Sequence, residues 1–256
     1  MLGAIAGDII GSVYEANPIK TTDFELFGEF SRFTDDTVLT IATAQAILHG
    51  MDYAEAYRTY GRRYPGAGYG AAFITWLRTD DAPPYNSWGN GSAMRISPVG
   101  YAGKTMDSVL HEAAKSAAVT HNHPEGIKGA QAVAAAIFMG RSGQSKTDIS
   151  RFITDHFAYD LKPTIARIRP AYFFDISCQR SVPQAIIAFL ESEDVESAIR
   201  LAISLGGDSD TQGCIAGAIA YAYYGEMAPE MECQVRRRLP REFVAILDAF
   251  LKRYAS

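Results

Sequence analysis

The sequence predicts an all-α protein. Apolar side chains recur at helical spacing in nearly every segment, whereas alternating strand patterns are scarce, and residues 172–176 are the best of a weak set. No linker, repeat or low-complexity run divides the 256 residues, and a hydrophobic content of 48% supplies a sizeable core. We therefore expect a single domain over residues 1–256, an orthogonal helical bundle of helix pairs around an interior rich in alanine and glycine.

The individual helices follow from periodicity and from start and stop signals. The first clear pattern places Val38 and Ile41 near one face, and Gly50 ends it. Pro124 at a first helical position favours a helix that runs to Gly140. The helices predicted in this way span residues 35–49, 107–119, 124–139, 146–156, 183–190, 195–204, 210–224 and 241–254.

Two segments repeat one arrangement of small residues. Gly3 and Gly7 enclose Ala-Ile-Ala, and Gly213 and Gly217 enclose Cys-Ile-Ala. Without a side chain, glycine lets a neighbouring backbone come close. We expect both segments to allow a close approach between helices.

A long irregular stretch, residues 61–92, is rich in glycine, proline and asparagine. Glycines allow backbone N–H groups to approach a ligand, and phosphate in particular, although such clusters are more often simple turns. Trp88 and Tyr85 within it are candidates either for stacking a base or for buried anchors. We expect binding chemistry in this stretch.

Two acidic clusters carry most of the functional information: residues 33–37 (Phe-Thr-Asp-Asp-Thr) and residues 206–211 (Gly-Gly-Asp-Ser-Asp-Thr). Oxygen-only clusters suit hard cations such as Mg²⁺ or Mn²⁺ and suit zinc poorly. Helix capping is the alternative for either cluster alone, because Asp, Ser and Thr are preferred caps. A cap needs only one oxygen, however, and crowded carboxylates repel each other unless a cation offsets their charge. A two-metal site is therefore expected if the fold brings the clusters together.

Composition limits the function further. A net charge of −5 and a pI near 5.6 argue against a general nucleic-acid-binding surface and against an anionic membrane as partner. The three cysteines form no CxxC pair and no zinc-type spacing, which favours a cytoplasmic location. The first residues make a poor signal peptide, and no uncharged apolar run reaches membrane-spanning length. The oligomeric state stays open between a monomer and a small homo-oligomer.

Ordered motifs give the chain a family resemblance. They are residues 7–15 (Gly-Asp-Ile-Ile-Gly-Ser-Val-Tyr-Glu), 33–37, 68–70 (Gly-Tyr-Gly), 89–95 (Gly-Asn-Gly-Ser-Ala-Met-Arg), 120–121 (Thr-His) and 206–211. Together they resemble the ADP-ribosylglycohydrolase family, whose founding type is the dinitrogenase reductase-activating glycohydrolase. The motifs extend over nearly the whole chain, and it is their order, not any one of them, that is specific.

The resemblance implies an all-α bundle with two Mg²⁺ or Mn²⁺ ions in a central cleft. The family hydrolyses the linkage between C1″ of the distal ribose of ADP-ribose and an acceptor atom. The implied metal ligands are Thr34, Asp35, Asp36, Asp208, Asp210 and Thr211. The residues expected in catalysis are Glu15, Asp35, Asp208 and Asp210. Glu15 is the acid/base candidate, and we expect Asp208 and Asp210 to orient water.

The resemblance also implies a substrate site. The Gly-Tyr-Gly turn and the Gly-Asn-Gly-Ser stretch are expected to line the pyrophosphate and ribose, and His121 lies near the substrate ribose in some members. The implied substrate-binding residues are Gly68, Tyr69, Gly70, Gly89, Asn90, Gly91, Ser92, Met94 and His121.

Several residues keep a structural interpretation beside the functional one. We expect Asp8 to be a polar anchor that supports the ligands. Arg95 is a candidate for phosphate binding or for a structural pair, and His123 for a helix cap. Cys214 is expected to be a small buried side chain, not a nucleophile. Residues 174–183 have no role that the sequence reveals, although they precede a helix start and are candidates to line the cleft.

Two other functions fit part of this pattern. A two-metal nucleotide phosphohydrolase would use the same carboxylates to cut P–O bonds. A catalytically silent ADP-ribose-binding module is the second alternative, although intact acidic clusters and Glu15 speak against it. For the hydrolase, the expected partner is the ADP-ribose moiety of a modified protein, nucleic acid or small molecule, without a stable nucleic-acid complex, whereas the phosphohydrolase would act on nucleotides. The acceptor stays open among arginine, serine, a nucleic-acid base or end, poly-ADP-ribose and a small metabolite.

Overall fold

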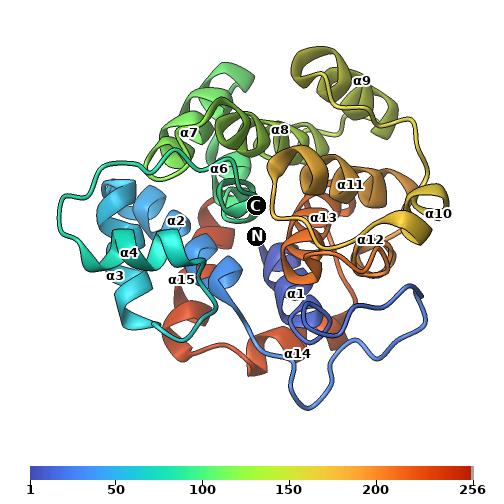
Figure 1. The fold of residues 1–256 in the computed structure, drawn as a ribbon, viewed down its shortest axis with the longest axis horizontal. Helices are drawn as coiled ribbons and strands as arrows, with labels where there is room; N and C mark the ends of the chain where they lie inside the picture. Colours follow the sequence, from blue (N-terminus) through green and yellow to red (C-terminus); the bar gives the residue numbers. More distant parts are fainter. Residues whose placement is uncertain (255–256) are drawn as a thin grey trace.

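The computed structural model describes residues 1–254 and is built from α-helices (Figure 1). Within these residues there is no strand, and the β-type pairing is an isolated antiparallel bridge between Gly89 and Ser177. The helices are α1 Leu2–Gly11, α2 Asp35–His49, α3 Tyr53–Arg63, α4 Ala71–Arg78, α5 Gly91–Met94, α6 Ser97–Ala102, α7 Met106–Ala118, α8 Pro124–Arg141, α9 Lys146–Phe157, α10 Ile165–Ile168, the 3₁₀-helix η1 Arg169–Ala171, α11 Cys178–Glu191, α12 Val195–Ile203, α13 Ser209–Tyr224, α14 Pro229–Arg237 and α15 Arg241–Tyr254. The predicted all-α fold is confirmed.

Most predicted helices lie within two residues of their expected bounds. The helix expected to begin at Pro183 instead begins at Cys178, so Pro183 lies inside α11. The start of α11 is held by packing against α8, because a Cβ on Gly129 would lie 2.4 Å from the sulfur of Cys178. This contact outweighs the preference of proline for the first turn of a helix, which had predicted a start at Pro183. The stretch 61–92 is also less irregular than expected, since it contains α4.

Helices α1 and α13 run antiparallel with their backbones in contact. A Cβ added to Gly7 would lie 2.0 Å from the carbonyl oxygen of Gly213, and one added to Gly3 would lie 2.1 Å from that of Gly217. The expected close approach of the two glycine segments is therefore confirmed. The contact brings the end of α1 beside the start of α13, where a Cβ on Gly11 would lie 2.4 Å from the carbonyl oxygen of Ser209.

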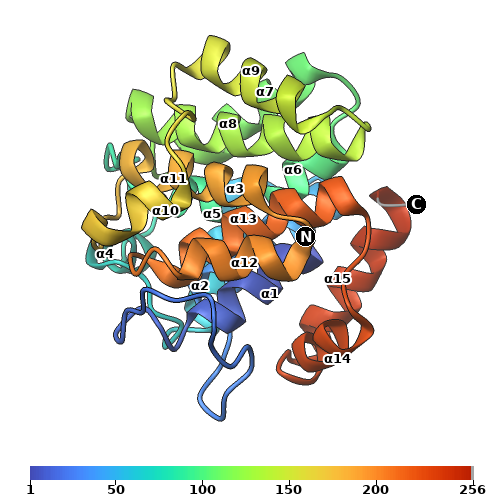
Figure 2. The ribbon, with the colours of Figure 1, turned by 90° about the vertical axis from the view of Figure 1, so that its right-hand side faces the viewer.

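Helix α13 lies in the interior of the bundle, and nearly all of its residues are buried. Figure 2 shows α8 and α9 on one side of α13 and α1 on the other. The buried apolar side chains form a contiguous cluster that includes many alanines of α8 and α13. Up to Tyr254, no helix is both long and apolar enough to span a bilayer.

Candidate active site

The two acidic clusters meet at the ends of three helices. Carboxylate oxygens of Asp8, Asp36 and Asp210 lie within 4.8 Å of one another, and so do those of Glu15, Asp208 and Asp210. Asp210 is common to both groups and lies at the start of α13, while Asp36 lies at the start of α2. The carboxylates that the sequence places far apart thus form one continuous acidic site.

Asp8 fixes the start of α2 against α1. Its carboxylate accepts hydrogen bonds from the backbone N–H of Thr34 at 2.9 Å and of Thr37 at 3.1 Å. It also accepts from both threonine hydroxyls, that of Thr34 at 2.6 Å. Thr34 in turn caps α2 by accepting from the N–H of Asp36. The geometry agrees with the expectation that Asp8 is a polar anchor, although its carboxylate is also close enough to be a ligand itself.

A tight turn positions the second cluster. Gly206 has a φ of +63°, and a Cβ there would lie 2.7 Å from the carbonyl oxygen of Ile19. Only glycine adopts this conformation without strain in so close a contact. A direct link then joins the clusters, because the hydroxyl of Thr211 donates to Asp36 Oδ2 at 3.4 Å.

The buried carboxylates repel one another. Burial, followed by the charge of Asp210, raises the pKa of Asp35, Asp36 and Asp208 well above the usual range. The same two causes raise the pKa of Asp8 to about 7. In addition, Asp36 Oδ1 is buried without a hydrogen-bond partner. A divalent cation would supply both the missing charge and the missing partner, so the residues present fit Mg²⁺ or Mn²⁺.

The acidic site opens into a cavity of about 460 Å³. Fourteen of the predicted site residues line it: Glu15, Thr34, Asp35, Asp36, Gly68, Gly70, Gly89, Asn90, Gly91, Met94, His121, Asp208, Asp210 and Thr211. Asn90 joins the glycine-rich segment to the acids by donating from Nδ2 to Asp208 Oδ2 at 2.7 Å. The cavity therefore unites the predicted metal and substrate residues on one surface.

Two of the predicted substrate-binding residues, Tyr69 and Ser92, are not part of the cavity lining. The Tyr69 ring is buried against Phe73, with ring centroids 5.1 Å apart. The Ser92 hydroxyl is fully buried and donates to the carbonyl oxygen of Gly126 at 2.7 Å. Their side chains stabilise the walls, so a role in direct substrate contact stays a prediction for them.

Glu15 lies in the loop after α1. Its side chain is exposed overall, yet desolvation and the charge of Asp210 raise the pKa of its carboxyl group, while Arg32 opposes that rise. Arg32 also lines the cavity, although no sequence pattern pointed to it. A carboxyl group with a raised pKa beside a cavity has the properties of a general acid.

The segment without an expected role, residues 174–183, does line the cavity, through Phe174 and Ile176. The N–H of Asn90 donates to the carbonyl oxygen of Ile176 at 2.7 Å, so this segment lies along the glycine-rich one. Trp88 is 46% exposed, and Phe174 and Ile176 are 49% and 50% exposed. Trp88 is therefore not a buried anchor, and these side chains form an apolar rim near the cavity.

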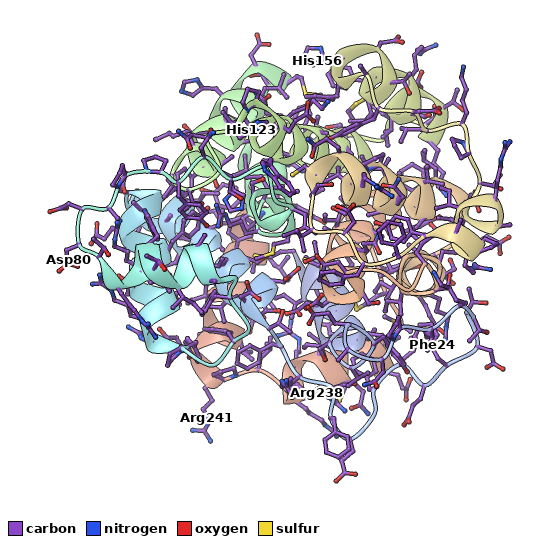
Figure 3. All side chains as sticks on the ribbon, in the orientation of Figure 1. Phe24, Asp80, His123, His156, Arg238 and Arg241 are labelled. Atoms are coloured by element: carbon purple, nitrogen blue, oxygen red, sulfur yellow. The ribbon has the colours of Figure 1, made fainter. Side chains whose placement is uncertain are left out.

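The other candidates have structural positions. His123, labelled in Figure 3, accepts from the N–H of Glu125 at 3.1 Å and so caps α8, as expected. Cys214 is buried and donates to the carbonyl oxygen of Met94, and burial raises the pKa of its thiol. This agrees with a small buried side chain.

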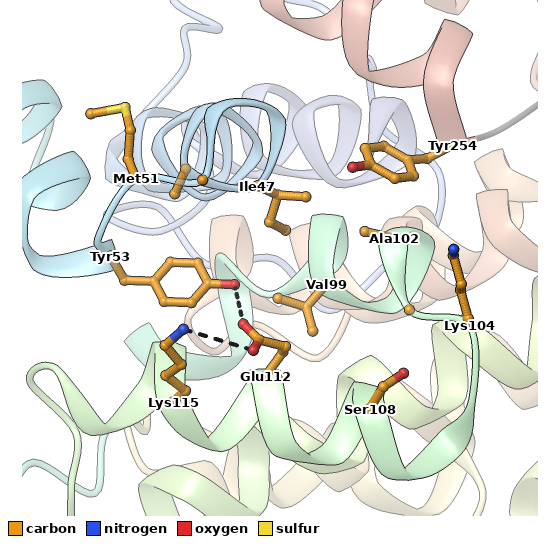
Figure 4. Close-up of a pocket in the computed structure, with 13 residues that line it drawn as sticks. Ile47, Met51, Tyr53, Val99, Ala102, Lys104, Ser108, Glu112, Lys115 and Tyr254 are labelled. Carbon is orange, nitrogen blue, oxygen red and sulfur yellow. Dashed lines mark hydrogen bonds and ion pairs between the residues drawn. The ribbon is translucent and has the colours of Figure 1, made fainter.

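A second cavity, of about 440 Å³, lies between α2, α6 and α7 (Figure 4). Tyr53 donates to Glu112 at 3.1 Å on its wall, and Lys115 pairs with the same carboxylate at 3.8 Å. None of the predicted site residues lines it. The acidic cavity is therefore the candidate active site.

Comparisons with known proteins agree with this geometry. Residues 1–253 match the family profile described as ADP-ribosylglycohydrolase. The ADP-ribosylhydrolase ARH3 of Xenopus tropicalis is 26% identical, over 88% of this chain and 86% of its own length, and the ARH3 of Homo sapiens is 27% identical, over 90% and 86%. A solved structure described as an ADP-ribosylglycohydrolase-related protein complex has a TM-score of 0.73 and 25% sequence identity, and covers 98% of this chain and 96% of that one. The chain belongs to the ADP-ribosylglycohydrolase family.

Proposed function

We propose that the protein is a metal-dependent hydrolase that cleaves the C1″ glycosidic linkage of ADP-ribosylated substrates and releases ADP-ribose. One observation carries the proposal: the groups Asp8/Asp36/Asp210 and Glu15/Asp208/Asp210 converge on a cavity that the glycine-rich segment also lines. The cavity volume of about 460 Å³ lies in the range of small-molecule sites. The names of the ARH3 relatives support the same activity.

The proposed reaction adds water across the bond between C1″ and the acceptor. The C1″–acceptor bond breaks, a bond from C1″ to the water oxygen forms, and a proton reaches the acceptor atom. Two Mg²⁺ or Mn²⁺ ions, held by Thr34, Asp35, Asp36, Asp208, Asp210 and Thr211, would orient ribose hydroxyls and lower the pKa of water.

The chain's own residues would perform the remaining steps. We assign to Glu15 the transfer of the proton to the acceptor, because its raised pKa keeps part of it protonated closer to neutral pH. Asp208 and Asp210 would orient the water, and Asn90 holds Asp208 in place at 2.7 Å. The carboxylates also stabilise the positive charge that develops on the ribose. Gly68, Gly70, Gly89 and Gly91 let the pyrophosphate approach the backbone.

The candidates to stack the adenine are the ring of Tyr85, which lines the cavity, and the exposed ring of Trp88, which precedes Gly89 in the sequence. Direct contacts of Met94 and His121 with the substrate belong to the same proposal. The acceptor is open among a protein side chain, a nucleic-acid end, poly-ADP-ribose and a small molecule.

The test is a timed digest of arginine-, serine- and nucleic-acid-linked ADP-ribose, with Mg²⁺, with Mn²⁺ and with EDTA, resolved by mass spectrometry. We expect free ADP-ribose only in the presence of metal, and the fastest substrate would identify the acceptor. Release of AMP and ribose phosphate would show a phosphohydrolase instead. No release from any substrate, together with ADP-ribose binding by calorimetry, would indicate a binding module. Asp36→Asn should abolish release, whereas Asp155→Asn, an exposed change on α9, should not.

A further inference from the structure

A buried arginine lies in the wall of the ligand cavity. Arg95 is fully buried, and its guanidinium stacks on the ring of Tyr57 at 4.4 Å. Its Nη2 donates to Thr120 Oγ1 at 2.7 Å, while Nε and Nη1 have no hydrogen-bond partner. No carboxylate within residues 1–254 forms an ion pair with it. Because an unpaired buried charge costs stability, its position calls for a functional reason.

The directions of the hydrogen bonds around Arg95 are fixed by chemistry. A guanidinium group only donates, so Thr120 Oγ1 accepts from Arg95. The hydroxyl then has its own proton to donate, and His121 Nδ1 lies 2.8 Å away. Arg95 Nη2 also faces Nδ1, at 3.4 Å. With the Thr120 proton directed to His121, both neighbours of Nδ1 are donors and Nδ1 accepts; a Thr120 hydroxyl that donated to Tyr85 would instead leave its oxygen free to accept from Nδ1.

The other ring nitrogen of His121 faces the cavity wall. A Cβ added to Gly91 would lie 3.0 Å from His121 Nε2, and one added to Gly89 would lie 3.6 Å from it. All three residues line the ligand cavity. Burial, followed by the charge of Arg95, lowers the pKa of His121 well below its usual value, so the ring is neutral at pH 7. A neutral ring that accepts at Nδ1 carries its proton on Nε2.

We propose that Arg95 is a positioning residue that, through Thr120, holds His121 as the Nε2–H tautomer and so makes it a hydrogen-bond donor to an oxygen of the bound ligand. The acceptor would be a ribose hydroxyl or a phosphate oxygen, and naming ADP-ribose as that ligand rests on the proposed function. In the opposite tautomer Nε2 would present a lone pair, which repels a phosphate oxygen and can only accept from a ribose hydroxyl. Arg95 lies in the cavity wall but has no exposed surface, so we assign it a positioning role through His121.

The first test reads the tautomer directly. The full chain, labelled with ¹⁵N-histidine, would be examined by long-range ¹H–¹⁵N NMR, and His121→Gln would identify the His121 signals. We expect an unprotonated Nδ1 and a protonated Nε2 in the wild type, without averaging between tautomers. Arg95→Met should replace this pattern by averaged or doubly protonated signals. A protonated Nδ1 in the wild type, or an unchanged pattern in a folded Arg95→Met protein, would overturn the proposal.

Tyr85 provides the matched control. Its ring lies 5.8 Å from that of His121, and its phenol is in hydrogen-bond contact with Thr120. If Thr120 donates to His121, Tyr85→Phe should leave the His121 shifts unchanged. A tautomer change in Tyr85→Phe would show that the phenol, and not Arg95, determines the tautomer of His121.

The second test measures ADP-ribose affinity by calorimetry. Thr120→Val removes the hydroxyl while keeping the branched shape, and Thr120→Ser keeps the hydroxyl. We expect Thr120→Val to weaken binding roughly 2- to 10-fold, the effect of one hydrogen bond, and Thr120→Ser to change it little. In a His121→Ala background, Thr120→Val should have no further effect. An equal loss in that background would mean a purely structural role and would overturn the proposal.

These measurements separate this inference from the proposed function. The NMR pattern requires neither metal nor turnover, and the affinity series requires only ADP-ribose. If the tautomer pattern is found but no ADP-ribosylated substrate is cleaved, the positioning of His121 by Arg95 and Thr120 stands and the hydrolase assignment fails. If cleavage is found but His121 is not the Nε2–H tautomer, the hydrolase assignment stands and the role of Arg95 as a positioning residue fails.

Discussion

Replacing Asp36 by asparagine is expected to stabilise the metal-free protein while removing its response to metal. Asp36 is fully buried, and its ligand oxygen lies within 4.8 Å of those of Asp8 and Asp210. Two unit charges at such a distance repel by roughly 3–4 kcal/mol at an effective dielectric constant of about 20. Proton uptake relieves part of this repulsion. We therefore expect a net gain of roughly 2 kcal/mol, or roughly 4–8 °C in Tm for a chain of this size.

The assay is thermal unfolding of the wild type, Asp36→Asn and Asp155→Asn, each in EDTA and in Mg²⁺ or Mn²⁺. The raised pKa of Asp36 sets the sign of the pH dependence, since the folded state binds a proton more readily than the unfolded state. The metal-free wild type should gain stability as the pH falls, so the advantage of Asp36→Asn should be large at pH 8 and small at pH 5. Asp155→Asn should follow the wild type in every condition. A lower Tm for metal-free Asp36→Asn, or a retained rise on adding metal, would refute the reasoning.

Three further predictions address other parts of the molecule. Gly7→Ala should lower the free energy of unfolding by roughly 1–3 kcal/mol, because its Cβ would meet the Gly213 carbonyl, whereas Gly28→Ala should stay within about 0.5 kcal/mol in the same denaturant titration. Glu15→Gln should lower kcat roughly 10²- to 10⁴-fold with ADP-ribose affinity retained, and an unchanged kcat would disprove the acid/base assignment. Trp88→Ala should weaken ADP-ribose binding roughly 10-fold in calorimetry, while Trp88→Phe keeps most of it, and equal affinities for both variants would contradict base stacking.

The helices were predictable where local signals agree with packing. Helix α2 matches its predicted bounds because Thr34 caps its start and Gly50, with a φ of +67°, ends it. Pro183 gave a misleading start because the contact between Cys178 and Gly129 of α8 involves residues far apart in the sequence. Such a contact leaves no trace in a local pattern.

The candidate site, like the helices, was predictable in part, from the composition of short segments. Two oxygen-rich clusters indicated a shared metal site, and the structure brings them together. The structure alone shows that Arg32 lines the cavity and that the Tyr69 ring packs on Phe73 and is not part of the lining, because side-chain direction in loops depends on tertiary contacts. A single domain over residues 1–256, a cytoplasmic location and the oligomeric state stay predictions.

The glycine contacts and the acidic cluster depend on each other. Asp8 lies on α1 and Asp210 on α13, and the two helices touch through Gly7 and Gly213. The separation of the two carboxylates is therefore set largely by backbone packing, and flexible side chains have little freedom to change it. The metal-free cluster has few ways to relax its repulsion except by binding protons, and this repulsion adds to burial in raising the pKa of Asp8. A bound cation would remove the same repulsion without any movement of the helices, so close helix packing would preorganise the proposed metal site.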